Sequence, residues 1–306
     1  MLFFTATNPG IALGGFVGER KEEIMAGVPS KWKPRDCMIG PTDDRESITR
    51  AMERAGFDFP AVAKPDVGER GLLVSKIDSI QDLLTLMQES PVVYMLQEYI
   101  SYPEEVSIFY TRMPGEQHGE ITSVTLKEYL NVVGDGVSTI EQLIRAKPRA
   151  LLQLEALRDK HGSRFRDILS EGERYQFHTI GNHSKGTMFM DGNHLISDRL
   201  QQTFDAISQE LEGIYYCRYD IKCASWEALE KGEDFRILEI NGIKSEPAHI
   251  YDPNYPVTDF YRTIWQHWDR IYAISKANRA RGVGTTPVPE AWKQLRSVMK
   301  YHKELD

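Results

Sequence analysis

Two apolar segments in the last third of the chain carry polar residues at every second position. In RYDIKCAS these residues are Arg218 and Asp220, and in RILEING they are Glu239 and Asn241. Because side chains alternate between the two faces of a strand, each pair is expected on one face. Buried charges must be paired or bind a metal, and carboxylate and amide oxygens suit Mg²⁺. A purely structural strand pair is the alternative, but it would rarely carry four polar residues on one face.

A second segment, FPAVAKPDVGERG, joins a short apolar run to a glycine-bearing loop. The run predicts a strand closed by Pro65, with Lys64 at its end. Gly68 and Gly71 allow a close approach of backbone N–H groups to a ligand, and Arg70 adds a second cation. This arrangement suits a phosphate group. An ordinary hairpin with a surface lysine is the alternative.

A third segment, LQEYISYPEEVSIF, places acidic residues at the end of one predicted strand and the start of the next. Gln97 and Glu98 end the first strand, and Glu105 follows seven residues after Glu98. The stretch EVSIFYTR is expected to pair with the strand before it. Carboxylates in a cleft can accept hydrogen bonds from an adenine amino group or from ribose hydroxyls. Solvated acids at strand ends are the alternative.

The remaining patterns predict a mixture of helices and strands. Residues 44–56 predict a short helix with Asp43 or Asp44 at its cap and Gly56 at its end. Further helical segments are expected at residues 79–87, 146–173 and 200–211. The tail from Thr258 to about Lys276 predicts a helix that packs on the core through Phe260, Ile264, Trp268 and Ile271. A helix on a membrane surface is the alternative for this tail.

Composition and charge exclude one class of partner. The chain has 306 residues, enough for one large domain or two lobes, and a formal net charge of -8. A nucleic-acid partner requires a basic face, so none is expected. Three cysteines without a CxxC pair indicate a reduced compartment. The N-terminal sequence predicts neither a signal peptide nor stable membrane insertion, so a cytoplasmic location is expected.

These segments, in this order, resemble the ATP-grasp superfamily over roughly residues 15 to 250. The resemblance implies that Lys64 is the second nucleotide lysine and that the PDVGERG loop is the glycine-rich lid. It also implies a first nucleotide lysine, for which Lys21 is the best candidate, with Lys31 and Lys33 as rivals. The ATP contacts implied by the resemblance are Lys21, Lys64, Gly68, Arg70, Gly71, Gln97, Glu98, Tyr99 and Glu105. Among them, the run from Gln97 to Tyr99 resembles the adenine hinge, and Glu105 resembles the ribose acid.

The same resemblance implies a magnesium site and an acceptor site. Magnesium, with Mn²⁺ as an alternative, would be held by Asp220, Glu239 and Asn241, and Arg218 and Lys64 would act on the transferred phosphate. The stretch NVVGDGVSTIEQLI at residues 131–144 is similar to cyanophycin synthetases and to the ATP-grasp part of bifunctional glutathione synthetases. In those enzymes a later loop lies near the acceptor. The corresponding substrate candidates here are Asn182, Ser184, Lys185 and Gly186. The segment SEPAHIYDP is expected to line the same pocket and adds Ser245 and Glu246.

The implied fold is α+β, with two lobes and a nucleotide bound between antiparallel sheets. The expected parts are a short N-terminal extension (1–20), a small lobe (21–110), a large lobe (111–256) and a helical tail (257–306). The separate domain that precedes the grasp region in most such ligases is largely missing. The carboxylate site is therefore expected to be incomplete, rebuilt or supplied by a partner protein. A homo-oligomer is the alternative to a partner that brings the missing domain.

The implied activity is that of an ATP- and magnesium-dependent ligase. It would join a small carboxylate to an amine or amino acid through an acyl phosphate. After Asn241 the chain reads GIKSEPAHIYDP instead of the proline–glycine turn of D-alanine–D-alanine ligases, which argues against a dipeptide product of that kind. The alternatives are a small-molecule kinase that phosphorylates a hydroxyl, or a nucleotide-binding protein without turnover.

Overall fold

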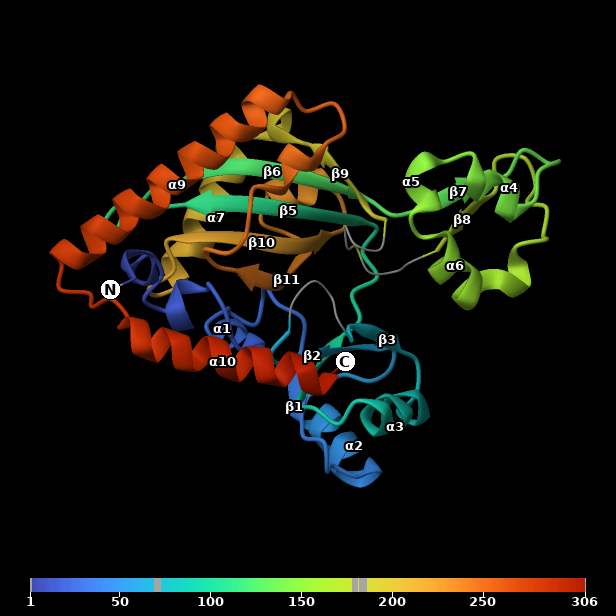
Figure 1. Ribbon diagram of the computed structural model, residues 1–306, viewed down its shortest axis with the longest axis horizontal. Coiled ribbons are helices and arrows are strands. Elements are labelled where there is room, and N and C mark those ends of the chain that lie inside the picture. The colour runs from blue at the N-terminus through green and yellow to red at the C-terminus, as the bar shows by residue number, and fades with distance from the viewer. Residues whose placement is uncertain (1, 69–72, 178–180, 182–185, 306) are drawn as a thin grey trace. The chain divides into compact units, whose positions relative to one another are not determined.

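The computed structural model describes residues 2–68, 73–177, 181 and 186–305 (Figure 1). The chain divides into two compact units, the first built from Met1–Leu126 and Asp191–Asp306 and the second from Lys127–Met190. Both sheets of the first unit are antiparallel in every strand pair whose register is resolved, which confirms the α+β class with antiparallel sheets. Among the helices of the described residues, none has the length and hydropathy that a bilayer span requires.

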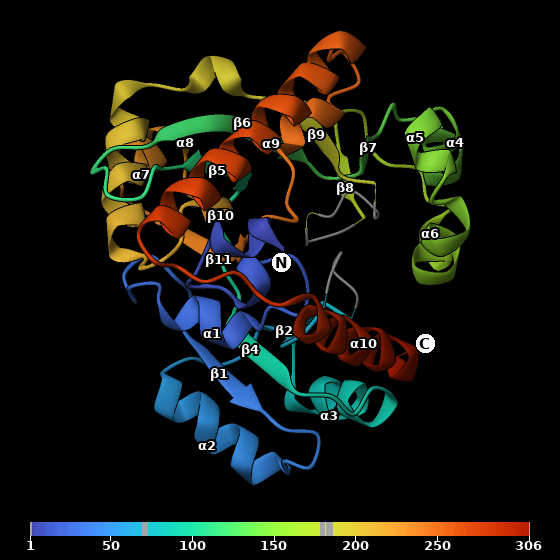
Figure 2. The same cartoon turned by 60° about the vertical axis from the view of Figure 1, so that its left-hand side comes forward.

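The smaller sheet of the first unit has four strands covered on one face by two helices (Figure 2). In spatial order the strands are β1 (Asp36–Ile39), β4 (Tyr94–Glu98), β2 (Ala61–Pro65) and β3 (Ser75–Ile77). The helices are α2 (Arg45–Ala55) and α3 (Ile80–Glu89). The Asp44 carboxylate caps α2 by accepting from the Ser47 amide at 2.9 Å, and Gly56 ends the helix at a φ of 78°. The cap and end residues of this helix are as predicted from the sequence.

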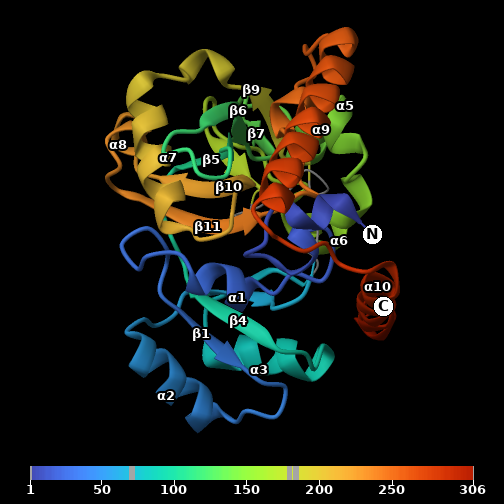
Figure 3. The ribbon, with the colours of Figure 1, turned by 90° about the vertical axis from the view of Figure 1, so that its left-hand side faces the viewer.

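The larger sheet has five strands between helices on opposite faces (Figure 3). In spatial order the strands are β11 (Phe235–Asn241), β10 (Tyr216–Cys223), β5 (Glu104–Thr111), β6 (Glu120–Glu128) and β9 (Met188–Asp191). Helix α7 (Asp198–Glu210) packs against the face that carries Ile108 and Tyr219. Helix α9 (Val257–Ala280) packs against the other face, where Ile274 meets Phe109 and Tyr216. Helix α8 (Trp226–Glu230) joins β10 to β11.

Two expectations from the sequence are wrong. Strand β5 does not pair with β4, because both edges of β4 are taken by β1 and β2, and β5 lies between β10 and β6. All residues of β5 after Glu104 are buried, as a central strand requires. The tail does form α9, but Trp268 faces solvent, because the buried face is centred on His267, Ile274 and Asn278. Trp268 therefore lies beyond the edge of the packed face.

The N-terminal segment is part of the core of the first unit. It contains two short 3-10 helices, η1 (Phe3–Ala6) and η2 (Ala12–Gly14), and Asn8 between them is fully buried. The Asn8 side chain accepts from the Tyr215 and Tyr216 amides and donates to the Tyr216 and Gly14 carbonyls. The three hydrogen bonds to Tyr215 and Tyr216 fix the segment to the start of β10, and the fourth holds the segment's own fold.

A close backbone crossing fixes the turn that follows β11. The Ile243 amide donates to the Gly14 carbonyl at 3.2 Å, and the Lys244 amide donates to the Gly15 carbonyl at 3.1 Å. A Cβ atom at Gly15 would lie 2.6 Å from the Gly242 Cα atom, so neither glycine has room for a side chain. Helix α1 (Lys21–Ala26) follows this segment, and α10 (Val288–Leu305) packs its Ala291 and Val298 against it.

The second unit has its own small core. Strands β7 (Asn131–Val133) and β8 (Arg174–Gln176) pair antiparallel. The helical elements are α4 (Ile140–Arg145), α5 (Pro148–Leu151), α6 (Leu154–His161) and η3 (Gly162–Arg164). Thr139 and Gln142 form a capping box at the start of α4. The region expected to be charged and helical thus contains short helices, and it ends at β8.

Candidate functional site

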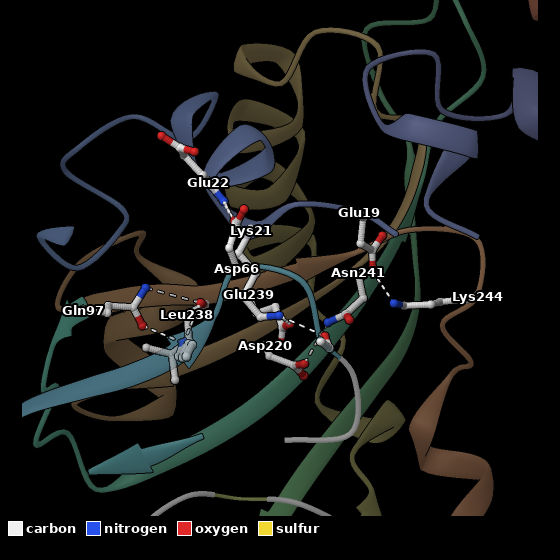
Figure 4. Close-up of polar contacts among 12 residues, drawn as sticks. Glu19, Lys21, Glu22, Asp66, Gln97, Asp220, Leu238, Glu239, Asn241 and Lys244 are labelled. Carbon is white, nitrogen blue, oxygen red and sulfur yellow. Dashed lines mark hydrogen bonds and ion pairs between the residues drawn. The ribbon is translucent and has the colours of Figure 1, made fainter. Parts of the chain in front are cut away.

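The register of β10 and β11 brings the four alternating polar residues together. Arg218 lies opposite Asn241, and Asp220 lies opposite Glu239. One oxygen of Asp220 accepts from Arg218 Nη2 and from Asn241 Nδ2, both at 3.1 Å, and the other accepts from the Ser107 hydroxyl of β5. Three strands therefore converge on one carboxylate, and Figure 4 shows its contact with Asn241.

The donor set of this strand pair fits a hard divalent cation. Asn241 turns its amide nitrogen to Asp220, so its carbonyl oxygen is directed to the other side. Glu239 keeps 35% of its side chain exposed, and its Oε1 atom lies 3.9 Å from the ammonium of Lys21. Two carboxylates and one amide oxygen are the ligand types that Mg²⁺ takes in phosphate-binding sites, where it also keeps water and phosphate ligands.

Lys64 of the smaller sheet reaches the same strand pair. Its ammonium donates to Gln97 Oε1 at 2.7 Å and to the Leu238 carbonyl of β11 at 3.1 Å. Burial lowers the pKa of Lys64 to about 8, although the nearby Glu239 carboxylate opposes this shift. The residue predicted as a nucleotide lysine thus lies beside one predicted metal ligand, contributed by the other sheet.

Lys21 is the first-lysine candidate that the structure brings to this site. It begins α1, its side chain is buried, and its ammonium donates to the Gly68 carbonyl at 2.9 Å. The Gly68 position itself leaves ordinary room, since a Cβ atom there would lie 3.5 Å from Pro65. Lys21 therefore links the start of the predicted lid to Glu239.

The two rival lysines are engaged elsewhere. Lys33 forms an ion pair with Asp36 at 2.9 Å. Lys31 is exposed, with its ammonium 4.0 Å from the centre of the Trp32 ring. Neither contact involves a residue of the β10–β11 pair, which favours Lys21 as the first nucleotide lysine.

The side chains of Gln97 and Glu98 in the predicted adenine hinge differ in burial and in their hydrogen-bond partners. Gln97 is almost fully buried and holds Lys64, whereas the Glu98 carboxylate is held by the Arg35 guanidinium, whose Nε atom donates at 2.9 Å. The hydrogen bond from Arg35 keeps the pKa of Glu98 below its usual value. Glu98 is therefore committed to Arg35 through its carboxylate and also through its backbone amide, which donates to the Arg35 carbonyl at 2.8 Å.

Lys222 is a buried cation beside the candidate site that the sequence analysis missed. It lies opposite Glu105 in the β10–β5 register, and both side chains are buried. Its ammonium donates to the Ile100 carbonyl at 3.2 Å and lies 5.4 Å from the centre of the Tyr99 ring. The signal was present, because Lys222 continues the period of two that begins at Arg218.

A second missed feature is the ion pair between Glu19 and Lys244, at 2.7 Å. Burial raises the pKa of Glu19, and the Lys244 ammonium opposes this shift. The Glu19 Oε2 atom is buried and has no hydrogen-bond partner in the described part of the chain. No local pattern marks Glu19, since only the fold of the N-terminal segment brings it beside the turn after β11 (Figure 4).

The acceptor candidates of the first unit have internal partners. The Ser245 hydroxyl donates to the Asn241 carbonyl at 3.2 Å and to the Gly242 carbonyl, and the Tyr251 hydroxyl donates to the Glu246 carboxylate. Ser245 and Glu246 therefore make contacts within the segment that follows β11.

The other acceptor and lid candidates belong elsewhere or are not described. Gly186 is in the second unit, where it has a φ of 86° and lies near Leu130. The predicted lid residues Arg70 and Gly71 and the predicted acceptor residues Asn182, Ser184 and Lys185 lie outside the described residues.

Comparisons with known proteins give matches among solved structures. No protein-family model and no curated protein sequence matches the chain. The bifunctional glutathione synthetase of Pasteurella multocida is 16% identical, with a TM-score of 0.45, over 81% of this chain and 36% of that one. The VanG D-Ala:D-Ser ligase of Enterococcus faecalis is 12% identical, with a TM-score of 0.45, over 84% of this chain and 61% of that one. The D-alanine–D-alanine ligase of Bacillus anthracis is 13% identical, with a TM-score of 0.49, over 86% of this chain and 69% of that one.

The motifs of this chain resemble two of these enzyme types, the bifunctional glutathione synthetases and the D-alanine–D-alanine ligases. The chain spans about a third of the glutathione synthetase and less than two thirds of the VanG ligase. At identities of 12% to 16%, the roles of individual side chains have to come from the geometry of this chain.

Proposed function

We propose that this chain is an ADP-forming ligase of the ATP-grasp type that joins a small carboxylate to an amine. One observation carries the proposal. The Lys64 ammonium of the smaller sheet donates to the Leu238 carbonyl of β11, next to Glu239. A cation suited to the phosphates and an acid suited to the metal thus approach from two different sheets, as binding of a metal-complexed nucleotide between them requires.

The cations of the site would hold the triphosphate. Lys21 and Lys64 each have a buried stem and a fixed ammonium, so little side-chain entropy is lost when they bind phosphate. Arg218 is held by Asp220 and would meet the oxygens of the phosphoryl group in transfer. Preorganised cations of this kind stabilise charge that develops in a transition state.

The carboxylates of the strand pair would hold magnesium. Asp220, Glu239 and Asn241 supply its oxygen ligands, and Ser107 keeps Asp220 oriented. Magnesium bound there would neutralise charge on the ATP phosphates, as in other phosphoryl transfers. At the other end of the same face, Glu105 would accept hydrogen bonds from the ribose hydroxyls, with Lys222 fixing its position.

The proposed reaction has two steps. A carboxylate oxygen of the first substrate attacks the γ-phosphorus of ATP, which forms an acyl phosphate and releases ADP. The amine nitrogen of the second substrate then attacks the acyl carbon, the bond to the phosphate oxygen breaks, and the amine loses a proton. The products are an amide, ADP and inorganic phosphate. The residues named above bind and orient these groups.

An ADP-release assay across a panel of amines and small acids tests the proposal. ADP is expected only when a carboxylate and an amine are both present, with one phosphate released per ADP. Lys64→Met should lose ATP-dependent turnover, while Lys31→Met, which changes an exposed lysine, should retain it. ADP release with hydroxyl acceptors and a stable phosphorylated product would instead identify a kinase. Nucleotide binding without ADP release under any condition would identify a binding protein.

A further inference from the structure

Helix α9 exposes a row of four aromatic side chains. Tyr261, Trp265, Trp268 and Tyr272 are each 56% to 70% exposed. The opposite face of α9 is packed on the larger sheet through Ile274 and on the N-terminal segment through Asn278, which donates to the Ala6 carbonyl. The aromatic row therefore lies on the outer face of α9, and the inner face of the helix is packed against the rest of the first unit.

The spacing of the row is that of a helix-pairing seam. Its members follow one another after four, three and four residues, the alternation that keeps side chains facing a second helix in a coiled coil. Tyr272 also contacts the ring of Phe3, which is itself partly exposed, so the apolar surface continues onto the N-terminal segment. Contiguous apolar surface of this kind marks an interaction site.

Charged residues beside the row fix the orientation of a second helix. Arg262 and Asp269 are exposed, lie seven residues apart on the same side of the row, and flank its centre. If two copies of α9 pair antiparallel, Arg262 of each copy approaches Asp269 of the other. In a parallel pair this flank would instead face the opposite flank of the other copy, which carries Ile264 and Ile271, so neither charge would meet an opposite charge.

We propose that this row is the two-fold interface of a homodimer in which two α9 helices pair antiparallel. Such an interface is self-complementary, because Trp265 of each copy packs on Trp268 of the other copy. Each aromatic side chain has about 150–250 Å² of surface, so four rings exposed by about two thirds offer roughly 500 Å² per protomer. The total of about 1,000 Å² reaches the lower limit for a specific interface.

A bilayer surface is the less favoured occupant. The formal net charge of -8 repels an anionic membrane. The homodimer does not depend on the proposed ligase activity.

Sedimentation velocity of the full chain tests the dimer. The chain is measured at about 1 to 100 µM, because dimers with interfaces of modest size dissociate in this range. The wild-type chain is expected to shift from monomer to dimer with concentration. The double variant Trp265→Ser, Trp268→Ser should weaken dimerisation by about 100-fold or more, as loss of central aromatic residues does. Trp292→Ser on α10, which removes another exposed tryptophan, is the matched control and should not change it.

Charge reversal tests the antiparallel arrangement. Arg262→Asp alone and Asp269→Arg alone should each weaken the dimer, and the two changes combined should restore it. A monomer at every concentration, or charge reversals that add instead of cancelling, would overturn the proposal. So would a monomeric chain that sediments with phosphatidylglycerol vesicles through Trp265 and Trp268, since the row would then be a lipid-binding surface.

Discussion

The two sheets of the first unit hold their candidate site residues in different ways. In the smaller sheet, Lys64 and Gln97 lie on adjacent strands and contact each other directly, 33 residues apart in sequence. In the larger sheet, Asp220 is held by Ser107, 113 residues away, and by Asn241 on the opposite strand. The smaller sheet forms its part of the site nearly by itself, whereas the larger sheet depends on the register of three strands.

The larger sheet also depends on segments outside it. Asn8 ties the N-terminal segment to the start of β10, and Gly15 crosses the turn after β11. Helix α9 adds His267, whose Nδ1 atom lies 2.9 Å from the Tyr216 hydroxyl. The metal-binding half of the proposed site should therefore respond to changes far from it, and the lysine half should respond much less.

The largest effect is expected from Asp220→Asn. The change keeps the shape of the side chain but removes the charge on which Ser107, Arg218 and Asn241 converge, so kcat should fall on the order of 10³-fold. The rate of magnesium-dependent ADP release measures this. Glu227→Gln, which alters an exposed acid on α8, is the control and should leave kcat unchanged. Equal rates in the two variants would show that the metal site is assigned to the wrong strands.

Asn8→Ala should cost about 3 kcal/mol of the free energy of unfolding, because it leaves one buried and one partly buried amide without acceptors and removes two donated bonds. Urea denaturation measures this value. The exposed Asn254→Ala is the matched control and should be close to neutral. A loss no larger than that of the control would mean that the larger sheet does not need the N-terminal segment.

Acid should destabilise the protein through His267. Burial, with a smaller effect from Arg270, lowers the pKa of this histidine from 6.5 to about 3. The unfolded chain takes up a proton below pH 6.5 that the folded protein cannot take up until about pH 3, so stability is lost as the pH falls through this range. At 1.36 kcal/mol per pH unit, the loss between pH 7 and pH 5 is about 2 kcal/mol.

Equilibrium unfolding at several pH values measures this loss. His267→Phe should flatten the dependence between pH 7 and pH 5, even though it removes the partner of Tyr216. His194→Gln, which changes an exposed histidine, should keep the wild-type slope. A wild-type slope in His267→Phe would assign the acid sensitivity to another group, such as His249, whose pKa burial also lowers.

The smallest effect is expected from Lys222→Met, at the end of the site that is proposed to bind the ribose. Loss of the ammonium beside Glu105 should raise the KM for ATP about tenfold, the amount that one charged hydrogen bond supplies. The preference for ATP over 2′,3′-dideoxy-ATP should fall at the same time. Lys76→Met, which removes the other cation near the Tyr99 ring, should leave that preference intact. An unchanged preference in Lys222→Met would separate this lysine from ribose recognition.

Local sequence was enough to predict many helices and strands, and to predict which polar residues share a face of β10 and of β11. The cap at Asp44 and the end at Gly56 were readable because a helix terminus is determined by residues within one turn. The alternation of Arg218 with Asp220 and of Glu239 with Asn241 was readable because a strand imposes a period of two. Each of these rules operates within a few residues of the chain.

Tertiary structure alone decided the rest. The contact from Lys64 to the Leu238 carbonyl spans 174 residues, and no local pattern distinguishes Lys21 from Lys31 or Lys33. The neighbours of β5 and the exposure of Trp268 were mistaken because both depend on which surfaces are already covered. Whether a surface is covered depends on the packing of the whole chain, because the elements that bury a side chain lie far from it in sequence.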